Sequence, residues 1–497
     1  MEVAKHIKQL VGETAIYGVS GVIVTLIGVV LIPVYTRVFA PSEYGFMSLI
    51  SSLMALVGPF VVLGLDNSAA RWYYDSQDPA VQRSTIASWF WCQVPLAAAI
   101  AVPMIVLAPW ISWVLIGSRE GAVLIRLAAI ALPFSSAGTI LHKWFRYQRR
   151  PVAAVTFGLG QTLTTIGMIL VLVVAFRQGL RGLFTAQLAA AVLTAIASVA
   201  LLRGSVSHRA FSWPQLKGML RFGLPLVPAA VAFWLMTSAN RFILNMYCDT
   251  HEVGLFSVGA SLAGGVSLVV GAFTQAWGPF AFSILNEEAS GRVYSRVFEL
   301  YSLLVCILCT GTALFAPLIL RLLTTPAYYP AASCVVFLAF ACGLEGARFI
   351  AGLGSGIAKQ SVPTAISIGI GAAVSLVLTF VLTPNLQKEG AALATMLAYY
   401  CSVVYLFAAS QKRHHIPYRW RTSLLCLGLS WGLIVVNWWC IPDTGIWPWA
   451  LRALLLFLFI PLGTSMGLLR WRYIRHLLNF GRAVPARAVH QTAQGSC

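Results

Sequence analysis

The chain has 497 residues, of which 59% are hydrophobic and only 10% are charged. An average soluble domain has roughly 25% charged residues. So little charge cannot coat a soluble protein of this length, which excludes a large soluble domain. The formal net charge of +19 would indicate nucleic acid binding in a soluble protein, but in so apolar a chain it indicates a membrane protein.

Fourteen apolar segments follow one another along the chain, and each is long enough to cross a membrane, which takes about 20 residues. They lie near residues 12–35, 46–65, 84–116, 121–141, 152–176, 180–202, 221–247, 253–283, 299–323, 331–352, 361–383, 390–409, 422–441 and 447–469. The sequence therefore predicts an all-α polytopic membrane protein with about fourteen transmembrane helices. The first segment is too long for the apolar region of a signal peptide, so we expect an uncleaved helix.

Basic residues are distributed unequally between the two sides of this predicted bundle. The N-terminal segment, alternate connections and the C-terminal tail contain 24 of the 34 lysines and arginines, whereas the opposite connections contain 6. Because cytoplasmic segments are rich in Lys and Arg, both termini are expected in the cytoplasm. The four remaining basic residues, Arg126, Arg241, Arg348 and Arg452, lie within or beside apolar segments.

An internal repeat relates the two halves of the chain. Residues 43–57 align without gaps with residues 252–266, and six of the fifteen positions are identical, including Gly45/Gly254 and Ser48/Ser257. The offset of 209 residues spans six helices, so the two copies have the same orientation. This pattern predicts two parallel six-helix lobes around a central cleft, the arrangement of an alternating-access transporter. The expected domains are 1–205, 206–412, a pair of extra helices in 413–470, and a basic cytoplasmic tail in 471–497.

The connections are too short for an enzyme of glycan assembly. None exceeds about twenty residues, and the carboxylates on the predicted outer side occur singly. A catalytic site that works by acid–base or metal chemistry needs such groups together. A G-x-x-x-x-G-K-[ST] phosphate loop, the motif that binds ATP, is absent from the sequence. Cys306 and Cys309 form a C-x-x-C, but they lie within a continuous apolar run, where a metal or redox role is not expected. We therefore expect no catalytic residues, no metal site and no cofactor.

Two regions resemble a known family. The chain reads PVYTRVFAPSEYGFMSLISSL at 33–53 and GLDNSAARWYY at 64–74. It then reads LRFGLPLVPAAVAFWLMTSANRFIL at 220–244 and EVGLFSVGASL at 252–262. These motifs resemble the Wzx-type polysaccharide biosynthesis flippases of the multidrug/oligosaccharidyl-lipid/polysaccharide (MOP) exporter superfamily. The family often has an acidic residue before the arginine of the seventh helix, where this chain has Asn240.

The resemblance implies a flippase in the bacterial cytoplasmic (inner) membrane. Its substrate would be an undecaprenyl-diphosphate-linked oligosaccharide, moved from the cytoplasmic to the outer leaflet for O-antigen, capsule or exopolysaccharide assembly. Polysaccharide polymerase and assembly proteins are the expected partners, and nucleic acid is not. A lipid II flippase and a multidrug/cation antiporter of the same superfamily are the alternatives; the antiporter predicts a more acidic cavity.

Polar side chains in apolar segments are the expected substrate-binding residues. An arginine within the membrane costs roughly 2.5–3.5 kcal/mol on insertion scales unless it has a partner or water. Arg241 either binds an anionic group of the substrate or extends to the interface as a structural cation. The expected set is Arg241, Asn240, Arg348, Arg126, Gln275 and Arg71.

Two carboxylates are the predicted ion-coupling residues, with H⁺ or Na⁺ as the coupling ion. Glu345 lies well inside an apolar segment, three residues before Arg348, so the two can share a helix face and pair. A coupling carboxylate and a permanently ionised structural pair are both open interpretations. Asp66 either contacts the incoming head group or caps a helix near the cytoplasmic side. Pro225 and Pro228 make the seventh helix the expected moving element.

Overall fold

The computed structural model of the chain describes residues 21, 23, 27, 28, 30–440 and 447–465. All regular structure in these residues is helical. The chain divides into two compact units. The first consists of the described parts of Met1–Ser283 and Leu318–His415, and the second of those of Ile284–Pro317 and Ile416–Cys497. The predicted domain limits follow the repeat instead and stay predictions, and the basic tail lies outside the described residues.

The first unit begins with helices that match the predicted apolar segments. They are α2 (Pro41–Val62), α3 (Leu65–Asp75), α4 (Pro79–Ile116), α5 (Ala122–Tyr147), α6 (Pro151–Ile169) with its π-helical extension η1 (Leu170–Ala175), and α7 (Gly179–Leu202). We call α2–α7 the first helix set. Proline stands in the first turn of α2, α4 and α6, where its missing N–H costs no hydrogen bond. The chain bends after α2 because Gly64 has a positive φ of 66°, which glycine adopts readily.

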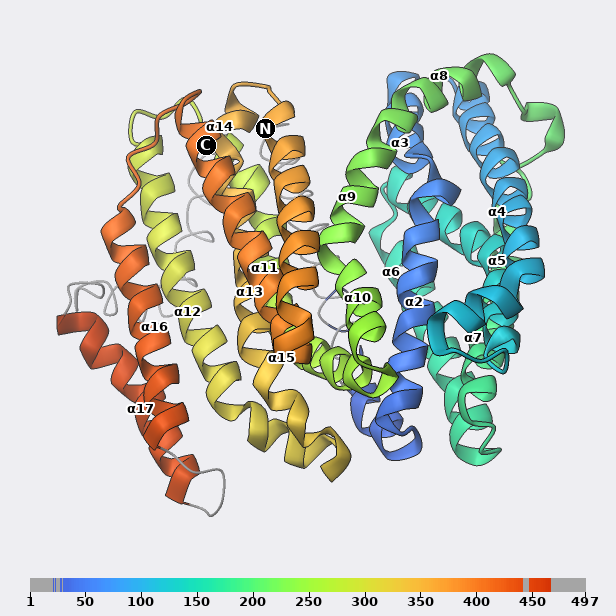
Figure 1. Ribbon diagram of the computed structural model, residues 1–497. Coiled ribbons are helices and arrows are strands. Elements are labelled where there is room, and N and C mark those ends of the chain that lie inside the picture. Colours follow the sequence, from blue (N-terminus) through green and yellow to red (C-terminus); the bar gives the residue numbers. More distant parts are fainter. Residues whose placement is uncertain (1–20, 22, 24–26, 29, 441–446, 466–497) are drawn as a thin grey trace, which may run out of the picture. The chain divides into compact units, whose positions relative to one another are not determined.

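The second helix set also belongs to the first unit. It consists of α9 (Val227–Thr237), α10 (Ala239–Tyr247), α11 (Thr250–Ser283), α13 (Ala332–Ala351), α14 (Leu353–Ile357) and α15 (Val362–Gln411). The 3-10 turn η2 (His208–Ala210), helix α8 (Trp213–Gly223) and the 3-10 turn η3 (Leu224–Leu226) connect the two sets, and η4 (Pro326–Ala331) precedes α13. Figure 1 shows α2–α7 on one side of this unit, α11, α13 and α15 on the other, and α9 and α10 between them.

Two predicted segments differ in detail from the helices that form. The segment 221–247 is interrupted twice, at Leu224–Leu226, which contains Pro225, and at Ser238, where φ is −130° and ψ is −23°. Conversely, α15 contains two predicted crossings, 361–383 and 390–409. They join at Gln387, whose φ of 45° and ψ of −128° are not helical.

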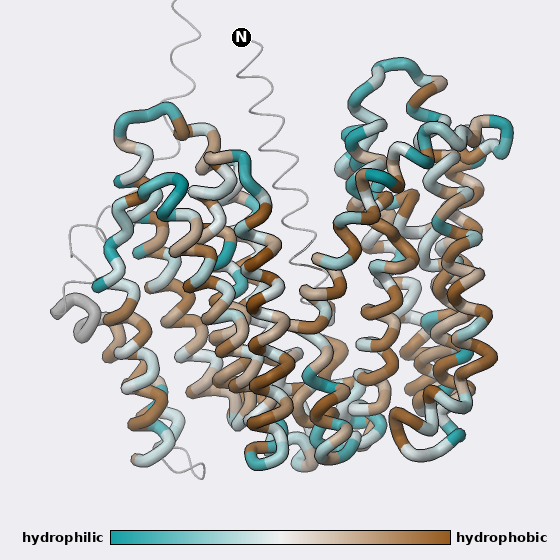
Figure 2. Tube along the Cα trace, turned by 45° about the horizontal axis from the view of Figure 1, so that its top comes forward, coloured by the Kyte–Doolittle hydropathy of each residue, from teal (hydrophilic) through white to brown (hydrophobic). Residues whose placement is uncertain are grey.

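The chain is a multi-pass membrane protein. Eleven helices in the described residues are long and apolar enough to span a membrane. One of them, α15, covers two predicted crossings, while α17 (Trp447–Ser465) has a shorter apolar part, Pro448–Phe459. The first predicted segment lies largely outside the described residues. Figure 2 shows hydrophobic residues along the middle of the helices and hydrophilic residues at their ends and in the connections.

The internal repeat appears as a reciprocal contact between α2 and α11. A Cβ atom added to Gly45 would lie 1.8 Å from the carbonyl oxygen of Thr250, and one added to Gly254 would lie 1.9 Å from that of Pro41. Pro41 and Thr250 are also 209 residues apart, so each contact is the counterpart of the other. The hydroxyl of Ser257 donates to that of Ser48 at 2.7 Å, again across 209 residues. This self-complementary pairing is what two-fold symmetry requires.

The connecting helix α8 packs against the first helix set at the opposite end of α2. A Cβ atom on Gly64 would lie 2.5 Å from the carbonyl oxygen of Gly223 in α8, and the Ser68 hydroxyl donates to the carbonyl oxygen of Met219 at 2.8 Å. We call the end of the first unit at which α2 and α11 begin the Gly45 end, and the opposite one the Gly64 end.

The second unit contains the part of α12 (Ser290–Leu323) up to Pro317, together with α16 (Trp420–Cys440) and α17. The side chains of Ser302 and Ser423 form a hydrogen bond of 2.9 Å between α12 and α16. Buried Arg452 of α17 donates from Nε to Oδ1 of Asn437 in α16 at 2.8 Å. These polar contacts join apolar helices at positions where hydrocarbon could not satisfy the side chains.

Candidate functional site

Arg241 lies where the two helix sets meet, near the start of α10. Its Nη1 donates to the carbonyl oxygen of Thr237 at 3.2 Å, and its guanidinium lies over the ring of Phe256 of α11, 5.4 Å from the centroid. It also interacts electrostatically with the hydroxyl of Tyr44 of α2. The Nε–H group of Arg241 is buried without a hydrogen-bond partner. Arg241 is thus a cation that packs on the ring of Phe256 and has a buried N–H group available for a further acceptor.

The break between α9 and α10 positions Arg241. Ser238 leaves the helical conformation three residues before it, so α10 starts afresh and presents its first turn to α2 and α11. Two further hydrogen bonds fix this segment against the first helix set. Trp234 Nε1 donates to the carbonyl oxygen of Ser52 at 2.8 Å, and Asn245 Nδ2 donates to that of Leu115 at 2.6 Å.

Asn240 faces α15, within the second helix set. Its side chain is buried, and Nδ2 donates to Oγ1 of Thr395 in α15 at 2.9 Å. Its Oδ1 atom is buried without a partner. The contact joins α10 to α15, so in this conformation Asn240 forms an interhelical hydrogen bond.

Arg348 and Glu345 lie on α13, and their side chains form neither a hydrogen bond nor an ion pair with each other. The guanidinium of Arg348 lies over Phe233 of α9, 5.5 Å from the ring centroid, and its Nη1 is buried without a hydrogen-bond partner. Half-buried Glu345 interacts electrostatically with Arg348 and with Tyr399 of α15. Within the described residues, the ion pairs that form at 4.0 Å or less do not include these two. The long arginine side chain extends to Phe233 instead.

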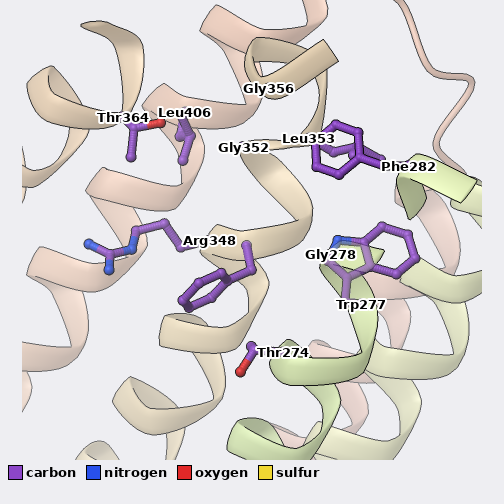
Figure 3. Close-up of a pocket in the computed structure, with 11 residues that line it drawn as sticks. Thr274, Trp277, Gly278, Phe282, Arg348, Gly352, Leu353, Gly356, Thr364 and Leu406 are labelled. Atoms are coloured by element: carbon purple, nitrogen blue, oxygen red, sulfur yellow. The ribbon is translucent and has the colours of Figure 1, made fainter. Parts of the chain in front are cut away.

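A cavity of about 260 Å³ lies beside Arg348, near the Gly64 end of the second helix set. Its wall is mainly apolar and aromatic. The lining residues are Thr274, Trp277, Gly278, Phe282, Arg348, Phe349, Gly352, Leu353, Gly356, Thr364 and Leu406. In Figure 3 the Arg348 side chain extends away from Trp277 and Phe282, so the guanidinium borders this cavity without entering its aromatic part. Gln275, next to Thr274, is exposed and does not line it.

The predicted site residues of the first helix set have local partners. Asp66 lies in the first turn of α3 and forms an ion pair with Lys143 of α5, while the hydroxyl of Tyr147 donates to the backbone oxygen of Asp66 at 2.7 Å. Arg71 is exposed, and its guanidinium lies 5.2 Å from the ring centroid of Phe222. The structure therefore does not bring Asp66 and Arg71 together with Arg241.

Arg126 has a structural partner as well. Its Nε donates to the carbonyl oxygen of Ile105 in α4 at 3.3 Å. This carbonyl lies four residues before Pro109, which has no N–H to bind it. The exposed Arg126 side chain thus replaces a missing helical hydrogen bond.

The aromatic partners Tyr44, Phe233 and Phe256 were not among the predicted site residues, although Tyr44 and Phe256 lie in the repeat segments. It also missed Glu299, buried in the second unit, which pairs with Arg296 and lies 3.5 Å from Arg419. The signal for Glu299 was an arginine three residues earlier on the same helix. Glu252 of the repeat pairs with Lys388 of α15 at 3.1 Å, a partner 136 residues away that no local pattern indicates.

A family model described as "Polysaccharide biosynthesis protein" matches residues 34–333. Among solved structures, the fold is similar to the lipid II flippase MurJ in an inward closed conformation, with a TM-score of 0.72 and 13% identity over 94% of this chain and 100% of that one. It is also similar to an inward-facing MATE multidrug transporter of the MOP superfamily, with a TM-score of 0.66 and 14% identity over 78% and 94% of the two chains.

A Vibrio cholerae MATE transporter has a TM-score of 0.56 and 14% identity over 82% of this chain and 96% of that one. At these identities the structures show a shared fold. No curated protein sequence matches the chain significantly.

Proposed function

Because the chain belongs to the polysaccharide biosynthesis protein family, we propose that it is a flippase for an undecaprenyl-diphosphate-linked oligosaccharide. It moves this lipid from the cytoplasmic to the outer leaflet of a bacterial inner membrane, where O-antigen, capsule or exopolysaccharide is assembled. The observation that carries the proposal is that Arg241 of the short helix α10 and Arg348 of the candidate span Pro326–Ile357 each have a buried N–H group without a hydrogen-bond partner.

A diphosphate is the kind of group that satisfies such donors. A buried polar group without a partner costs about 1–3 kcal/mol, and phosphate oxygens accept charge-assisted hydrogen bonds from arginine. The aromatic rings of Phe256 and Phe233 occupy a face of each guanidinium and leave edge N–H groups for an anion. Aromatic contact thus stabilises the cation while no substrate is present.

The charge distribution of the sequence supports an orientation with the Gly45 end outward. In this orientation the α2–α11 contact closes the outer side, and alternating access requires these helices to separate. An inside-negative potential favours outward movement of an anion by about 2.3 kcal/mol per charge per 100 mV. Two net negative charges would gain roughly 4–5 kcal/mol, which helps to drive export without ATP hydrolysis.

We assign ion coupling, by H⁺ or Na⁺, to Glu345 rather than Asp66. Asp66 forms an ion pair with Lys143, so its charge is already balanced. Glu345 has no ion pair within 4.0 Å among the described residues, and it shares electrostatic contacts with Arg348. A proton or cation at Glu345 would therefore change the field at the arginine that we assign to the substrate.

A lipid II flippase is the second candidate, because the fold extends over the whole length of MurJ. Both substrates are polyprenyl diphosphates, so both use the same cations, and they differ in the sugar. A cation antiporter is disfavoured because cations need acidic partners, whereas Arg241 and Arg348 provide the opposite charge.

Reconstituted vesicles test the proposal. We expect Arg241→Gln and Arg348→Gln to slow transfer of a labelled polyprenyl-diphosphate oligosaccharide about 10- to 100-fold, the equivalent of one charge-assisted hydrogen bond. Arg126→Gln is the matched control, because that arginine binds a backbone carbonyl, and its transfer rate should stay within about twofold of wild type. Unchanged transfer by both folded test variants would refute the anion assignment. Faster transfer of lipid II than of the oligosaccharide would favour the second candidate.

A further inference from the structure

A second cavity lies in the first helix set, remote from Arg241 and Arg348 in the sequence and formed by α4, α5 and α7. It is a groove of about 610 Å³ whose lining is apolar apart from one cation. Its lining includes Phe90 of α4, Phe134 of α5, Val192, Ile196 and Val199 of α7, and Arg203. In Figure 1 these three helices lie on the side of the first helix set that faces away from the second set. The groove therefore belongs to a different surface from the candidate substrate site.

The length of the groove matches one leaflet of a bilayer. Along α7 it extends from Val192 to Arg203, which at 1.5 Å per residue is about 16 Å. Half of a hydrocarbon core of about 30 Å is about 15 Å. Val199 and Ile196 are among its exposed large hydrophobic residues, so an apolar chain can reach it from the side. These dimensions fit a single acyl chain and are too short for an extended polyprenyl chain.

The cation stands at the end of the groove that corresponds to a lipid head group. Arg203 directly follows the last residue of α7 and is exposed. Its side chain makes no hydrogen bond or ion pair with the part of the chain that the structure describes, and it lines one end of the groove. Favourable interaction with the C-terminal end of the α7 dipole would account for an arginine at this position. It would not account for an apolar groove that leads to it.

Trp91 indicates the level of the membrane interface beside the groove. It follows Phe90 of the groove wall, is 40% exposed, and its Nε1 donates to the carbonyl oxygen of Val206 at 3.0 Å. Tryptophan gathers at the boundary between hydrocarbon and head groups. Because Val206 lies three residues after Arg203, this contact places the guanidinium near the same boundary.

We propose that this groove binds an anionic glycerophospholipid, with one acyl chain against α4, α5 and α7 and the phosphate at Arg203. Basic pockets between transmembrane helices recognise anionic head groups in this way. The lipid would come from the leaflet at the Gly64 end, because Arg203 follows the end of α7 on that side. The bound lipid would fill a gap between three helices of the first set.

Photo-crosslinking of the full chain in lipid nanodiscs tests the site. The probe is phosphatidylglycerol with a photoreactive group on one acyl chain, present in trace amounts in phosphatidylcholine. We expect labelled peptides from 90–94, 133–137 and 192–200, and competition by unlabelled phosphatidylglycerol but not by added phosphatidylcholine. Arg203→Gln should lower this labelling about fivefold, as expected for one basic residue near the surface, and Arg203→Lys should restore most of it.

Matched variants separate the groove from the surface around it. Ala200→Trp fills the groove from an exposed position and should abolish labelling there, whereas Ala197→Trp, exposed on the same helix but outside the lining, should not. Lys217→Gln, exposed on α8, controls for general loss of positive charge. Labelling outside the groove, or unchanged labelling in Arg203→Gln and Ala200→Trp, would overturn the proposal. Stronger competition by a polyprenyl phosphate than by phosphatidylglycerol would also overturn it.

Discussion

The reciprocal contact between α2 and α11 makes a sharp prediction about conformational change. A Cβ atom at Gly45 would lie 1.8 Å from the Thr250 carbonyl oxygen, and one at Gly254 would lie 1.9 Å from that of Pro41. Non-bonded heavy atoms prefer about 3.5 Å or more, so Gly45→Ala requires the two helices to separate by more than 1 Å. Overpacking of this kind costs about 1–3 kcal/mol, which shifts the equilibrium away from the closed contact about 5- to 150-fold.

The assay is a disulfide between residues 48 and 257. The two hydroxyl oxygens are 2.7 Å apart, so Ser48→Cys/Ser257→Cys should form a disulfide under mild oxidation, quantified as a linked peptide by mass spectrometry. Peptide-level detection is needed because the chain has ten cysteines of its own. The locked protein should not transfer substrate until it is reduced. Added Gly45→Ala or Gly254→Ala should lower the yield of the linked peptide.

Glycines on the same helices provide the controls. Gly58 of α2 and Gly264 of α11 have nothing within 4 Å of an added Cβ atom, so alanine there changes helix propensity by about 1 kcal/mol without a clash. The same propensity change occurs at Gly45 and Gly254, and the comparison cancels it. Equal crosslinking in Gly45→Ala and Gly58→Ala would refute the argument that this contact is tight.

Three further predictions follow from individual contacts. Glu345→Gln should remove the dependence of transfer on the coupling ion, whereas Asp66→Asn should keep it. Asp66→Asn should lower the free energy of unfolding by about 1 kcal/mol or less, as expected for a partly exposed ion pair. The opposite result would assign ion coupling to Asp66. Asn240→Ala should lower the free energy of thermal unfolding by about 1 kcal/mol or less, because it removes one interhelical hydrogen bond together with a buried unpaired oxygen. A loss of transfer without a loss of stability would contradict this structural role. Burial, and then the neighbouring Tyr294, raises the pKa of Tyr418, which lies in the connection before α16. Because the folded chain binds this proton more tightly than the unfolded chain, the contribution of Tyr418 to stability is complete below about pH 10 and decreases above it. Tyr418→Phe should therefore flatten the profile of melting temperature between pH 9 and 11.

The sequence predicted the helices well because a membrane imposes a simple rule on apolar length. It also predicted the repeat, whose two copies meet at Gly45 and Gly254. The bend at Gly64 was harder to predict, because the apolar segment ends there while the chain continues as α3. As a result, Asp66 lies in the first turn of a new helix instead of at the end of the previous one.

The partners of the site residues could not be predicted, because they are distant in the sequence. Asn240 binds Thr395, 155 residues away. Arg126 binds the carbonyl oxygen of Ile105, which has no helical partner because Pro109, four residues later, lacks an N–H group. The expected pairing of Glu345 with Arg348 follows from helical spacing alone. It fails as a direct contact because spacing fixes a shared face but not the direction in which a long side chain extends.

The helix break at Ser238 also lacks a local signal. Pro225 marks the first interruption of the seventh predicted segment, but neither proline nor glycine lies between Pro228 and Ser238. The hydrogen bonds of Trp234 and Asn245 to the first helix set lie on either side of this break. Tertiary contacts therefore determine where Arg241 lies.

Flippase activity can be tested in cells that lack this chain, by measuring how lipid-linked intermediates are distributed between the two leaflets. We expect an undecaprenyl-diphosphate-linked oligosaccharide to accumulate in the cytoplasmic leaflet, and the wild-type chain, but not Arg241→Gln/Arg348→Gln, to restore its export. A normal distribution of that oligosaccharide, or accumulation of lipid II in its place, would show that this chain does not export it.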